Sequence, residues 1–232
     1  NDIYLETSSA FDIDIIERLY LNKMLNKDTL IVCNGFKTKI YTQRISKLAN
    51  LDFNIMPVLD NMEELEAYEN TIIYDCDLGI RIASEEQPEF QLYTSRLGIR
   101  YKEIKDFYLN KIKPNPKFKL KMLHFFINTG INDNAYYWNE LSKLLKVYVE
   151  LKRVCPELDS LNIGGGWPFR SSLGFEYDYA YMAEEILNKI KQTCEEENVS
   201  CPNIFTEFGS FTVAESGAFI FSVLAEKHQN DS

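Results

Sequence analysis

The stretch Leu161-Asn162-Ile163-Gly164-Gly165-Gly166-Trp167-Pro168 places three consecutive glycines directly after a short apolar run that predicts a buried strand. Glycine has no Cβ and adopts positive φ readily, so backbone N–H groups in such a turn can approach a ligand closely. Several N–H groups at the end of a strand form a cradle for an anion, most often a phosphate. A plain tight turn would also use glycine. Three of the ten glycines stand here, which favours the phosphate cradle.

Segments with strand and helix patterns alternate along the chain. Short apolar runs predict strands, and apolar residues spaced three and four apart predict amphipathic helices between them. The strands are expected at 3–6, 30–33, 53–56, 79–83, 121–126, 160–163 and 203–207, and the helices at 10–25, 38–49, 61–69, 100–112, 134–153 and 177–197. Asp133 and Asn134 are suitable caps for the helix at 134–153. Strict alternation is typical of an α/β protein with a parallel sheet.

Two closures of such a sheet compete, an open doubly wound sheet and a (β/α)8 barrel. Seven strands are one fewer than the barrel needs, and the chain enters the pattern abruptly at Ile3. We therefore expect residues 1–216 to form a (β/α)8 TIM barrel that lacks its first strand. The apolar run at 219–224 predicts one more strand, so residues 217–232 are expected to begin the connection to a further domain.

The composition narrows the class of protein. A chain of 232 residues with 45% hydrophobic and 13% aromatic residues can bury a large core and does not resemble a disordered protein. A net charge of −10 argues against nucleic acid as the main partner. No apolar run approaches the roughly 18 residues that a membrane span needs, and no signal peptide is visible, so no membrane contact is expected.

The cysteines and histidines predict neither a disulfide framework nor a metal site. Five cysteines are scattered without CxxC spacing, and the sequence has only two histidines. A zinc site is therefore not expected. A reducing cytoplasm is the simplest setting for such a set of cysteines.

The active site of a barrel lies at the carboxyl ends of its strands. Glu6, Arg81 and Glu207 are expected at this rim together with the glycine run. Arg81 lies between isoleucines, where arginine is seldom buried without a partner, so a site role is favoured over a structural ion pair. Glu207 could instead be an ordinary loop carboxylate or a cap. Gly209-Ser210, which follow it, could donate hydrogen bonds to an anion.

His124 has apolar neighbours on its expected strand, so a hydrogen-bonded core histidine is favoured over a catalytic base. The predicted rim carries no pair of a nucleophile and a histidine. A phosphate cradle with carboxylates but without such a pair indicates a bound phosphorylated cofactor that supplies the difficult chemistry itself.

Six stretches carry a resemblance that covers nearly the whole chain in order. They are Leu5–Ala10, Cys33–Lys37, Gly79–Ala83, Ser95–Gly98, Leu161–Pro168 and Thr206–Ser210. The chain resembles the alanine-racemase-like barrel of pyridoxal 5'-phosphate (PLP) decarboxylases, and most closely the biosynthetic arginine decarboxylases. The glycine run alone would also fit a sugar-phosphate barrel enzyme, but the combination of Glu6, Arg81 and Glu207 disfavours that class.

The resemblance implies roles for individual residues. It places Gly164, Gly165 and Gly166 against the cofactor phosphate and Glu207 against the pyridine nitrogen, where a negative partner keeps that nitrogen protonated. It implies that Arg81 and Glu6 lie near the cofactor, and that Thr129 helps to hold the phosphate.

The chain departs from the family pattern at two of these places. Phe126 stands where the family commonly stacks a histidine on the cofactor ring. A phenylalanine can still stack on that ring but cannot form a hydrogen bond. Glu207-Phe208-Gly209-Ser210 replaces Glu-Pro-Gly-Arg, which removes a charge-assisted contact to the phosphate. These changes fit a divergent decarboxylase and also fit an inactive relative. The resemblance places the lysine that bonds the cofactor upstream of this chain, and the substrate-facing cysteine in a C-terminal β domain. Lys37 is interpreted as structural or as lining the rim.

The resemblance implies a whole enzyme that converts L-arginine to agmatine and CO2 for polyamine and spermidine synthesis. It implies PLP as cofactor, Mg2+ in the whole enzyme, and a homo-oligomer with active sites at a dimer interface. The alternatives are a non-catalytic regulatory subunit of the same fold, and a diaminopimelate or ornithine decarboxylase. By itself the chain is expected to be inactive and to self-associate, because it exposes sheet edges that other parts would cover.

Overall fold

The computed structural model describes residues 4–84, 97–127, 130–170 and 174–217, together with Ile220 and Ser222. The strands are β1 (Leu5–Thr7), β2 (Ile31–Cys33), β3 (Ile55–Leu59), β4 (Cys76–Ala83), β5 (Ile99–Arg100), β6 (Phe118–His124), β7 (Ser160–Asn162) and β8 (Asn203–Phe205). They form one sheet in the order β1-β2-β3-β4-β6-β7-β8, with β5 paired to β4. Every pair is parallel, as the alternating pattern predicted.

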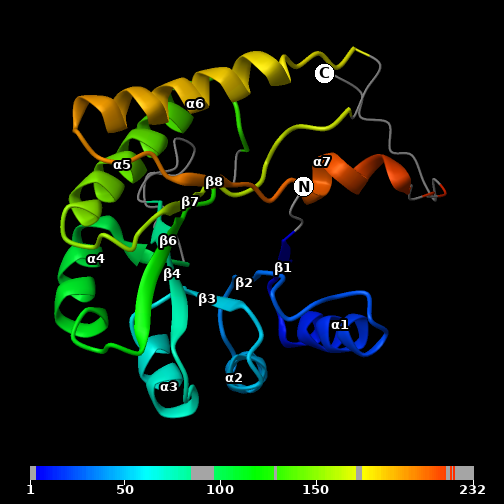
Figure 1. Cartoon of the computed structure of the whole chain (residues 1–232). Helices are drawn as coiled ribbons and strands as arrows, with labels where there is room; N and C mark the ends of the chain where they lie inside the picture. The colour runs from blue at the N-terminus through cyan, green and yellow to red at the C-terminus, as the bar shows by residue number, and fades with distance from the viewer. Residues whose placement is uncertain are drawn as a thin grey trace, which may run out of the picture.

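The helices follow one another around the outside of the curled sheet (Figure 1). They are α1 (Ala10–Leu21), α2 (Lys39–Asn50), α3 (Glu64–Thr71), α4 (Tyr101–Phe107), α5 (Ala135–Lys152), α6 (Tyr179–Glu196) and α7 (Gly209–Val213), with a π-helical turn at Tyr108–Ile112 and a 3-10 turn at Ala214–Ser216. The expectation of an α/β barrel of parallel strands is confirmed as a curled, open barrel. No helix among the described residues is both long and apolar enough to cross a membrane.

Successive side chains of a strand point to opposite sides of the sheet, and here both sides are buried. On β2, Ile31 and Cys33 belong to the large core between the sheet and the helices. The intervening Val32 belongs to a smaller cluster inside the curl, with Met56, Val58 and Met122. This inner cluster fills the concave side beneath the carboxyl ends of the strands.

The two outer strands of the sheet approach each other through aromatic rings. Tyr4, just before β1, stacks on Phe205 at the end of β8, with 5.5 Å between ring centroids and 25° between ring planes. The strand pairs of the described residues do not include β8 with β1. The barrel is therefore open between these two strands, and each has one paired neighbour.

The predicted elements agree with the structure apart from short features. The strand β5 was not predicted, and the expected helix at 100–112 divides into α4 and the π-helical turn. Asn134 caps α5, since its side chain accepts a hydrogen bond from the Tyr137 N–H at 2.8 Å. The expected strand at 219–224 and the connection at 217–232 fall almost entirely outside the described residues.

Candidate functional site

The glycine run packs between the loops that follow β6 and β8. Gly164 and Gly166 have φ of 71° and 101°, in the region that favours glycine. A Cβ on Gly165 would lie 2.4 Å from the carbonyl oxygen of Glu207, and one on Gly166 would lie 2.7 Å from Cα of Gly130. The Glu207 N–H donates to the Gly164 carbonyl at 2.9 Å. Backbone contacts of this kind leave no room for a side chain at these positions.

Glu207 lies two residues beyond β8, and its carboxylate oxygen Oε1 is the focus of contacts from three other strands. Asn34, which follows β2, and Asn162, the last residue of β7, each donate from Nδ2 to Oε1 at 2.6 Å. Nε2 of His124, the last residue of β6, lies 3.5 Å from the same oxygen. Segments distant in sequence therefore meet at one carboxylate, at the carboxyl ends of the strands.

Asn34 also joins the two carboxylates that the sequence placed at the rim. Its Nδ2 donates to Oε1 of Glu6 at 3.2 Å as well as to Glu207. Burial raises the pKa of Glu207, and the nearby Glu6 adds to the rise, while the hydrogen bonds from Asn162 and Asn34 oppose it. Glu6 is itself exposed to solvent, so water screens its charge, and desolvation raises its pKa against the hydrogen bond from Asn34.

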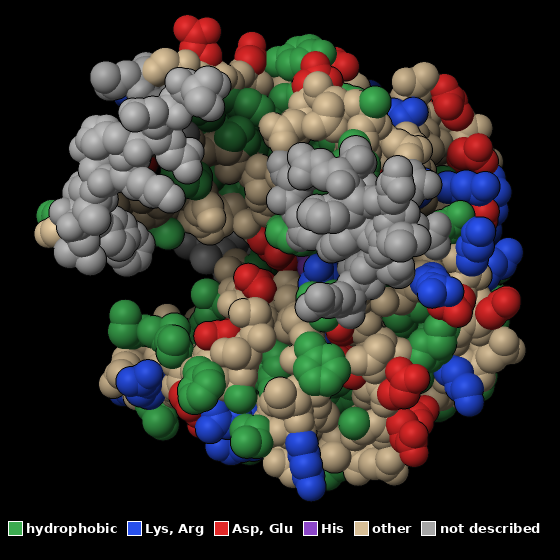
Figure 2. All heavy atoms as spheres, turned by 180° about the vertical axis from the view of Figure 1, so that it is seen from behind, with side chains coloured by type: hydrophobic (Ala, Val, Ile, Leu, Met, Phe, Trp, Pro, Cys, Tyr) green, Lys and Arg blue, Asp and Glu red, His purple; other side chains and the backbone are tan. Residues whose placement is uncertain are grey.

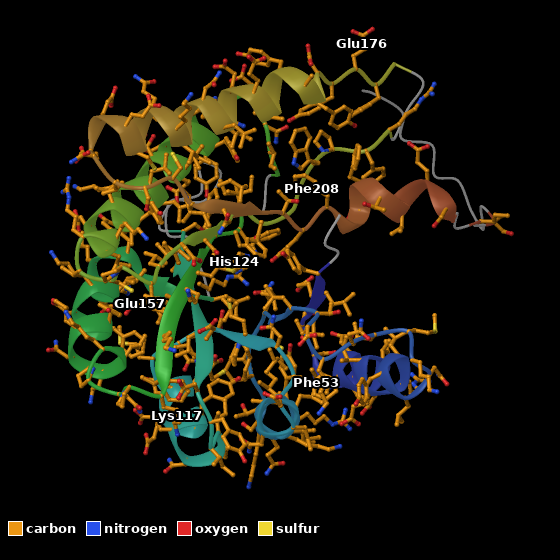
Figure 3. All side chains as sticks on the ribbon, viewed as in Figure 1. Phe53, Lys117, His124, Glu157, Glu176 and Phe208 are labelled. Atoms are coloured by element: carbon orange, nitrogen blue, oxygen red, sulfur yellow. The ribbon has the colours of Figure 1, made fainter. Side chains whose placement is uncertain are left out.

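His124 lies inside the curl and is only 2% exposed. Figure 3 shows it at the carboxyl end of β6, with Lys117 before the strand at the other end. Burial lowers the pKa of His124 to about 3, with Arg81 and Lys37 adding to the effect, so the ring is neutral at pH 7. The expected burial is confirmed. The expected hydrogen bonding is not found, because neither ring nitrogen has a hydrogen-bond partner in the described part of the chain.

Arg81 and Phe126 lie together on the concave side. Arg81 is half-buried on β4 and pairs in register with His124 on β6. The guanidinium carbon of Arg81 lies 5.8 Å from the centroid of the Phe126 ring, within range of a cation–π contact. A Cβ on Gly164 would lie 3.4 Å from an edge carbon of the same ring. Phe126 thus connects the arginine to the glycine cradle.

The remaining predicted site residues are Gly209, Ser210 and Thr129. Gly209 and Ser210 are exposed at the start of the five-residue α7. Thr129 lies outside the described residues.

Figure 2, seen from behind, shows the molecule hollowed from one side, with acidic side chains at the inner end of the hollow.

Asn34 and Asn162 were given no role by the sequence, although both lie in stretches that carry the resemblance. Each is a polar residue at the carboxyl end of a buried strand, which is the position where barrel proteins place site residues. That signal could have identified them. Their common target, Glu207, is visible only in three dimensions.

Lys37 is structural, in agreement with its interpretation from the sequence. Its side chain is fully buried, and Nζ donates to the carbonyl oxygens of Gly35 and Val58 and lies 3.5 Å from Oε2 of Glu64. Burial lowers the pKa of Lys37, while the carboxylate of Glu64 opposes that change. An ammonium group held in this way is not available as a nucleophile.

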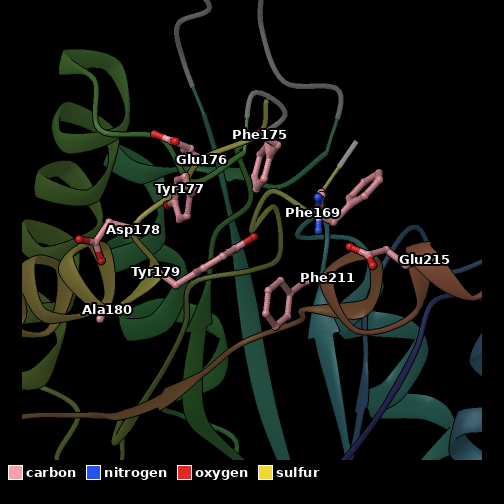
Figure 4. A pocket seen from close by; sticks show the side chains of 10 residues that line it. Phe169, Phe175, Glu176, Tyr177, Asp178, Tyr179, Ala180, Phe211 and Glu215 are labelled. Atoms are coloured by element: carbon pink, nitrogen blue, oxygen red, sulfur yellow. The ribbon is translucent and has the colours of Figure 1, made fainter. Parts of the chain in front are cut away.

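A cavity of about 890 Å3 lies beside the glycine run and has aromatic walls (Figure 4). Trp167, directly after the glycines, packs on Tyr177, Tyr179 and Phe208 at centroid distances of 5.8, 5.4 and 5.0 Å. Tyr179 continues this aromatic wall to Phe211 of α7. None of the predicted site residues lines this cavity. Among the described residues, no group of three or more His, Cys, Asp or Glu side chains could hold a metal ion.

Comparison with known proteins identifies relatives over most of the chain. A family model described as the pyridoxal binding domain of pyridoxal-dependent decarboxylases matches residues 5–214. The biosynthetic arginine decarboxylase of Citrifermentans bemidjiense is 28% identical over 222 residues, which cover 86% of this chain and 34% of that protein. This chain therefore spans about a third of the length of the curated relatives that it matches.

Solved structures of two decarboxylases share the fold. The biosynthetic arginine decarboxylase of Campylobacter jejuni matches with a TM-score of 0.69 at 23% identity, over 90% of this chain and 34% of that one. The diaminopimelate decarboxylase of Helicobacter pylori, complexed with L-lysine, matches with a TM-score of 0.70 at 20% identity, over 93% of this chain and 53% of that one. At these identities the likeness supports the fold alone.

Proposed function

This chain belongs to the pyridoxal-dependent decarboxylase family, and from that premise we propose that it forms the cofactor-binding barrel of a PLP-dependent arginine decarboxylase. The proposed reaction of the whole protein converts L-arginine to agmatine and CO2, a step of polyamine and spermidine biosynthesis. The observation that carries the proposal is the packing of the glycine cradle directly against the backbone of Glu207. A phosphate site and an oriented carboxylate thus share one rim.

The residues present fit PLP. The glycine run presents backbone with no Cβ, as a phosphate cradle requires, and Glu207 offers a carboxylate for a protonated ring nitrogen. Oδ1 of Asn34 and both ring nitrogens of His124 are buried without hydrogen-bond partners in the described residues, close to Glu207. A polar ligand in this position would supply hydrogen-bond partners to these atoms.

We propose that the backbone N–H groups of Gly165 and Gly166 bind the phosphate, with help from Thr129, Gly209 and Ser210, while Gly164 shapes the turn and donates its own N–H to Asn162. When bound, PLP supplies an electron sink for the charge left by the departing CO2. In this proposal Glu207 holds a proton on the pyridine nitrogen and Phe126 packs against the ring. Arg81 and Glu6 set the charge around it.

Arginine is the proposed substrate because the curated relatives are named biosynthetic arginine decarboxylases. Diaminopimelate and ornithine are the alternatives. A non-catalytic regulatory subunit is the second candidate function. Phe126 in place of a stacked histidine, and Ser210 in place of a phosphate-binding arginine, favour that reading.

We further propose a division at residue 216, with 1–216 as the barrel portion and 217–232 as the connection to a C-terminal β domain. In the whole protein we propose a homo-oligomer in the cytoplasm, with Mg2+ as a second requirement. These proposals rest on the resemblance.

The test uses the intact protein. PLP binding is followed by absorbance, and CO2 release is measured with arginine, diaminopimelate, ornithine and lysine in parallel. The proposal expects bound PLP and the highest kcat/KM with arginine, and a large loss of both PLP affinity and turnover in Glu207→Ala. The absence of both bound PLP and CO2 release from any substrate would favour the regulatory subunit. A protein that binds no PLP would exclude the proposed cofactor site.

A further inference from the structure

The carboxylate of Glu207 is held on one side by two buried amides. Asn34 is 4% exposed and Asn162 is 2% exposed, and both donate to Oε1 at 2.6 Å. Bonds from an amide to an ionised oxygen are short and stronger than those between neutral groups. Two such bonds on one oxygen fix the direction of the carboxylate more firmly than either would alone.

The orientation of the Asn162 amide follows from its other contact. Its Oδ1 accepts a hydrogen bond from the Gly164 N–H at 2.9 Å. Because a backbone N–H can only donate, the oxygen must face Gly164 and the NH2 group must face Glu207. Asn162 therefore connects the first glycine of the cradle to the carboxylate through a single side chain.

The Asn34 amide is also fixed by its surroundings. Its backbone N–H donates to the Thr7 carbonyl at 2.8 Å, and its NH2 group is shared between Glu6 and Glu207. A donor between the two carboxylates favours their ionised forms, and the hydrogen bond from Asn34 lowers the pKa of each. Asn34 is the described residue that donates to both.

His124 does not provide a positive charge for Glu207. Its Nε2 lies 3.5 Å from Oε1, beyond a good hydrogen bond, and burial keeps the ring neutral. The donors that favour the ionised carboxylate are the two amides, with Arg81 acting at longer range.

We propose that Asn34 and Asn162 are positioning residues, which hold Oε1 of Glu207 so that its second oxygen is presented to the pyridine nitrogen of the cofactor. Asn162 additionally sets the distance between that carboxylate and the phosphate cradle. This inference rests on the proposed PLP site. It concerns residues that act through Glu207 and not on the cofactor directly.

The test is a double-mutant cycle on PLP affinity, measured by equilibrium dialysis of PLP against the intact protein. Asn162→Leu removes the donor at similar volume and should weaken PLP binding about tenfold or more, as expected for one hydrogen bond to a charged group. In a Glu207→Ala background, which leaves no side-chain oxygen for the amide to hold, the same change should add less than about a twofold loss. Asn34→Leu should behave in the same way.

A second readout is the pH profile of PLP binding. The ionisable groups around Glu207 are Glu6, Arg81 and His124, and they are unchanged in Asn162→Leu. Loss of a donor disfavours the ionised carboxylate, so the pH below which binding is lost should move upward. Asn54→Leu is the matched control, since Asn54 is an exposed asparagine whose side chain donates to the Asp28 carbonyl at 3.1 Å, away from the site. It should leave both readouts unchanged.

The outcomes distinguish the proposed role of Glu207 from the positioning role of the two asparagines. If Glu207→Ala binds PLP as tightly as the wild type, the proposed role of Glu207 is wrong. If Glu207→Ala weakens binding but Asn162→Leu does not, the positioning inference alone is overturned. It is also overturned if the losses of the single variants add in the double variant, because Asn162 would then act independently of Glu207.

Discussion

Glu207 carries its charge in a place that disfavours charge. Burial and the neighbouring Glu6 raise its pKa above the ordinary value of 4.5. A carboxyl whose pKa is raised in the folded state contributes nothing unfavourable below the unfolded pKa. It destabilises the fold progressively as pH rises through the folded pKa. The negative charge that the proposed function needs is thus unfavourable for the stability of the fold.

Glu207→Gln should therefore stabilise the cofactor-free protein at pH 8. Glutamine keeps an oxygen for Asn34 and Asn162 but carries no charge. The expected rise in melting temperature is about 2–4 °C, the shift that ~1 kcal/mol gives a protein of this size. The rise should disappear near pH 4, where the wild-type carboxyl is protonated. Glu150→Gln, an exposed position on α5, serves as control and should change little at either pH. A fall in melting temperature at pH 8 would contradict this account.

Gly165 offers a purely steric prediction. Its Cβ would meet the Glu207 carbonyl oxygen at 2.4 Å, and backbone cannot yield as a flexible side chain can. Gly165→Ala should cost about 1–3 kcal/mol of stability and weaken PLP binding, because the loops after β7 and β8 must separate. Gly174→Ala is the matched control, since nothing lies within 4 Å of a Cβ there. Chemical denaturation of both variants measures the difference.

Single residues also show what sequence reasoning could reach. The glycine run and Glu207 could be proposed from their positions after predicted strands, with a tight turn and a loop carboxylate as the alternatives. Asn34 and Asn162 lie at strand ends, where site residues are expected, but an asparagine there serves equally well in a turn or a cap. Only the fold brings positions 34, 162 and 207 to one oxygen atom.

Elements are joined around the site by the buried pair of Lys37 and Glu64. Lys37 lies in the loop between β2 and α2, its Nζ donates to the Val58 carbonyl of β3, and Glu64 begins α3. The Glu64 carboxylate also accepts from the backbone N–H of Lys37 and of Asp60, at 3.1 and 3.0 Å. One ion pair therefore holds the loop that carries Asn34.

Lys37→Met should destabilise the protein by about 3 kcal/mol or more, because it leaves the Glu64 carboxylate buried without its cation. The double variant with Glu64→Gln should recover part of the loss, since it removes the uncompensated charge. Urea denaturation of the single and double variants measures both. Lys191→Met is the control, because Lys191 lies on exposed α6 at 3.9 Å from Glu195. If the double variant were less stable than Lys37→Met, the ion pair would not be the cause.

Elements with a clear apolar pattern were predicted, and elements that depend on pairing or packing with distant residues were not. The seven main strands and the outer helices follow from apolar runs and from spacings of three and four residues. The strand β5 has two residues and depends on its pairing with Ile82 and Ala83 of β4, which no local pattern reveals. The π-helical turn after α4 is likewise a matter of packing more than of sequence period.

The whole molecule is a barrel wall with two outer strands, β1 and β8. Each has one hydrogen-bonded neighbour among the described strands, and unpaired strand edges template association. The fold class followed from strict alternation of strands and helices. The open side could be inferred from a count of strands, but the ring contact between Tyr4 and Phe205 across it could not.

The 232-residue chain expressed alone should therefore self-associate. Size-exclusion chromatography with light scattering over a tenfold concentration range should show a mass that rises with concentration, while the intact protein gives a fixed mass. A monodisperse monomer of the chain alone at all concentrations would count against open strand edges as a cause of association.

The packing of Trp167 gives this chain an intrinsic fluorescent reporter next to the glycine run. Trp167 is 8% exposed and follows the glycine run directly, whereas Trp138 is half-buried on α5, with its Nε1 donating to Asp133. The sequence has no other tryptophan. With Trp138 replaced by phenylalanine, all indole emission would come from one ring beside the cradle. Its wavelength and intensity would then report, without any attached dye, whether a chromophore has entered.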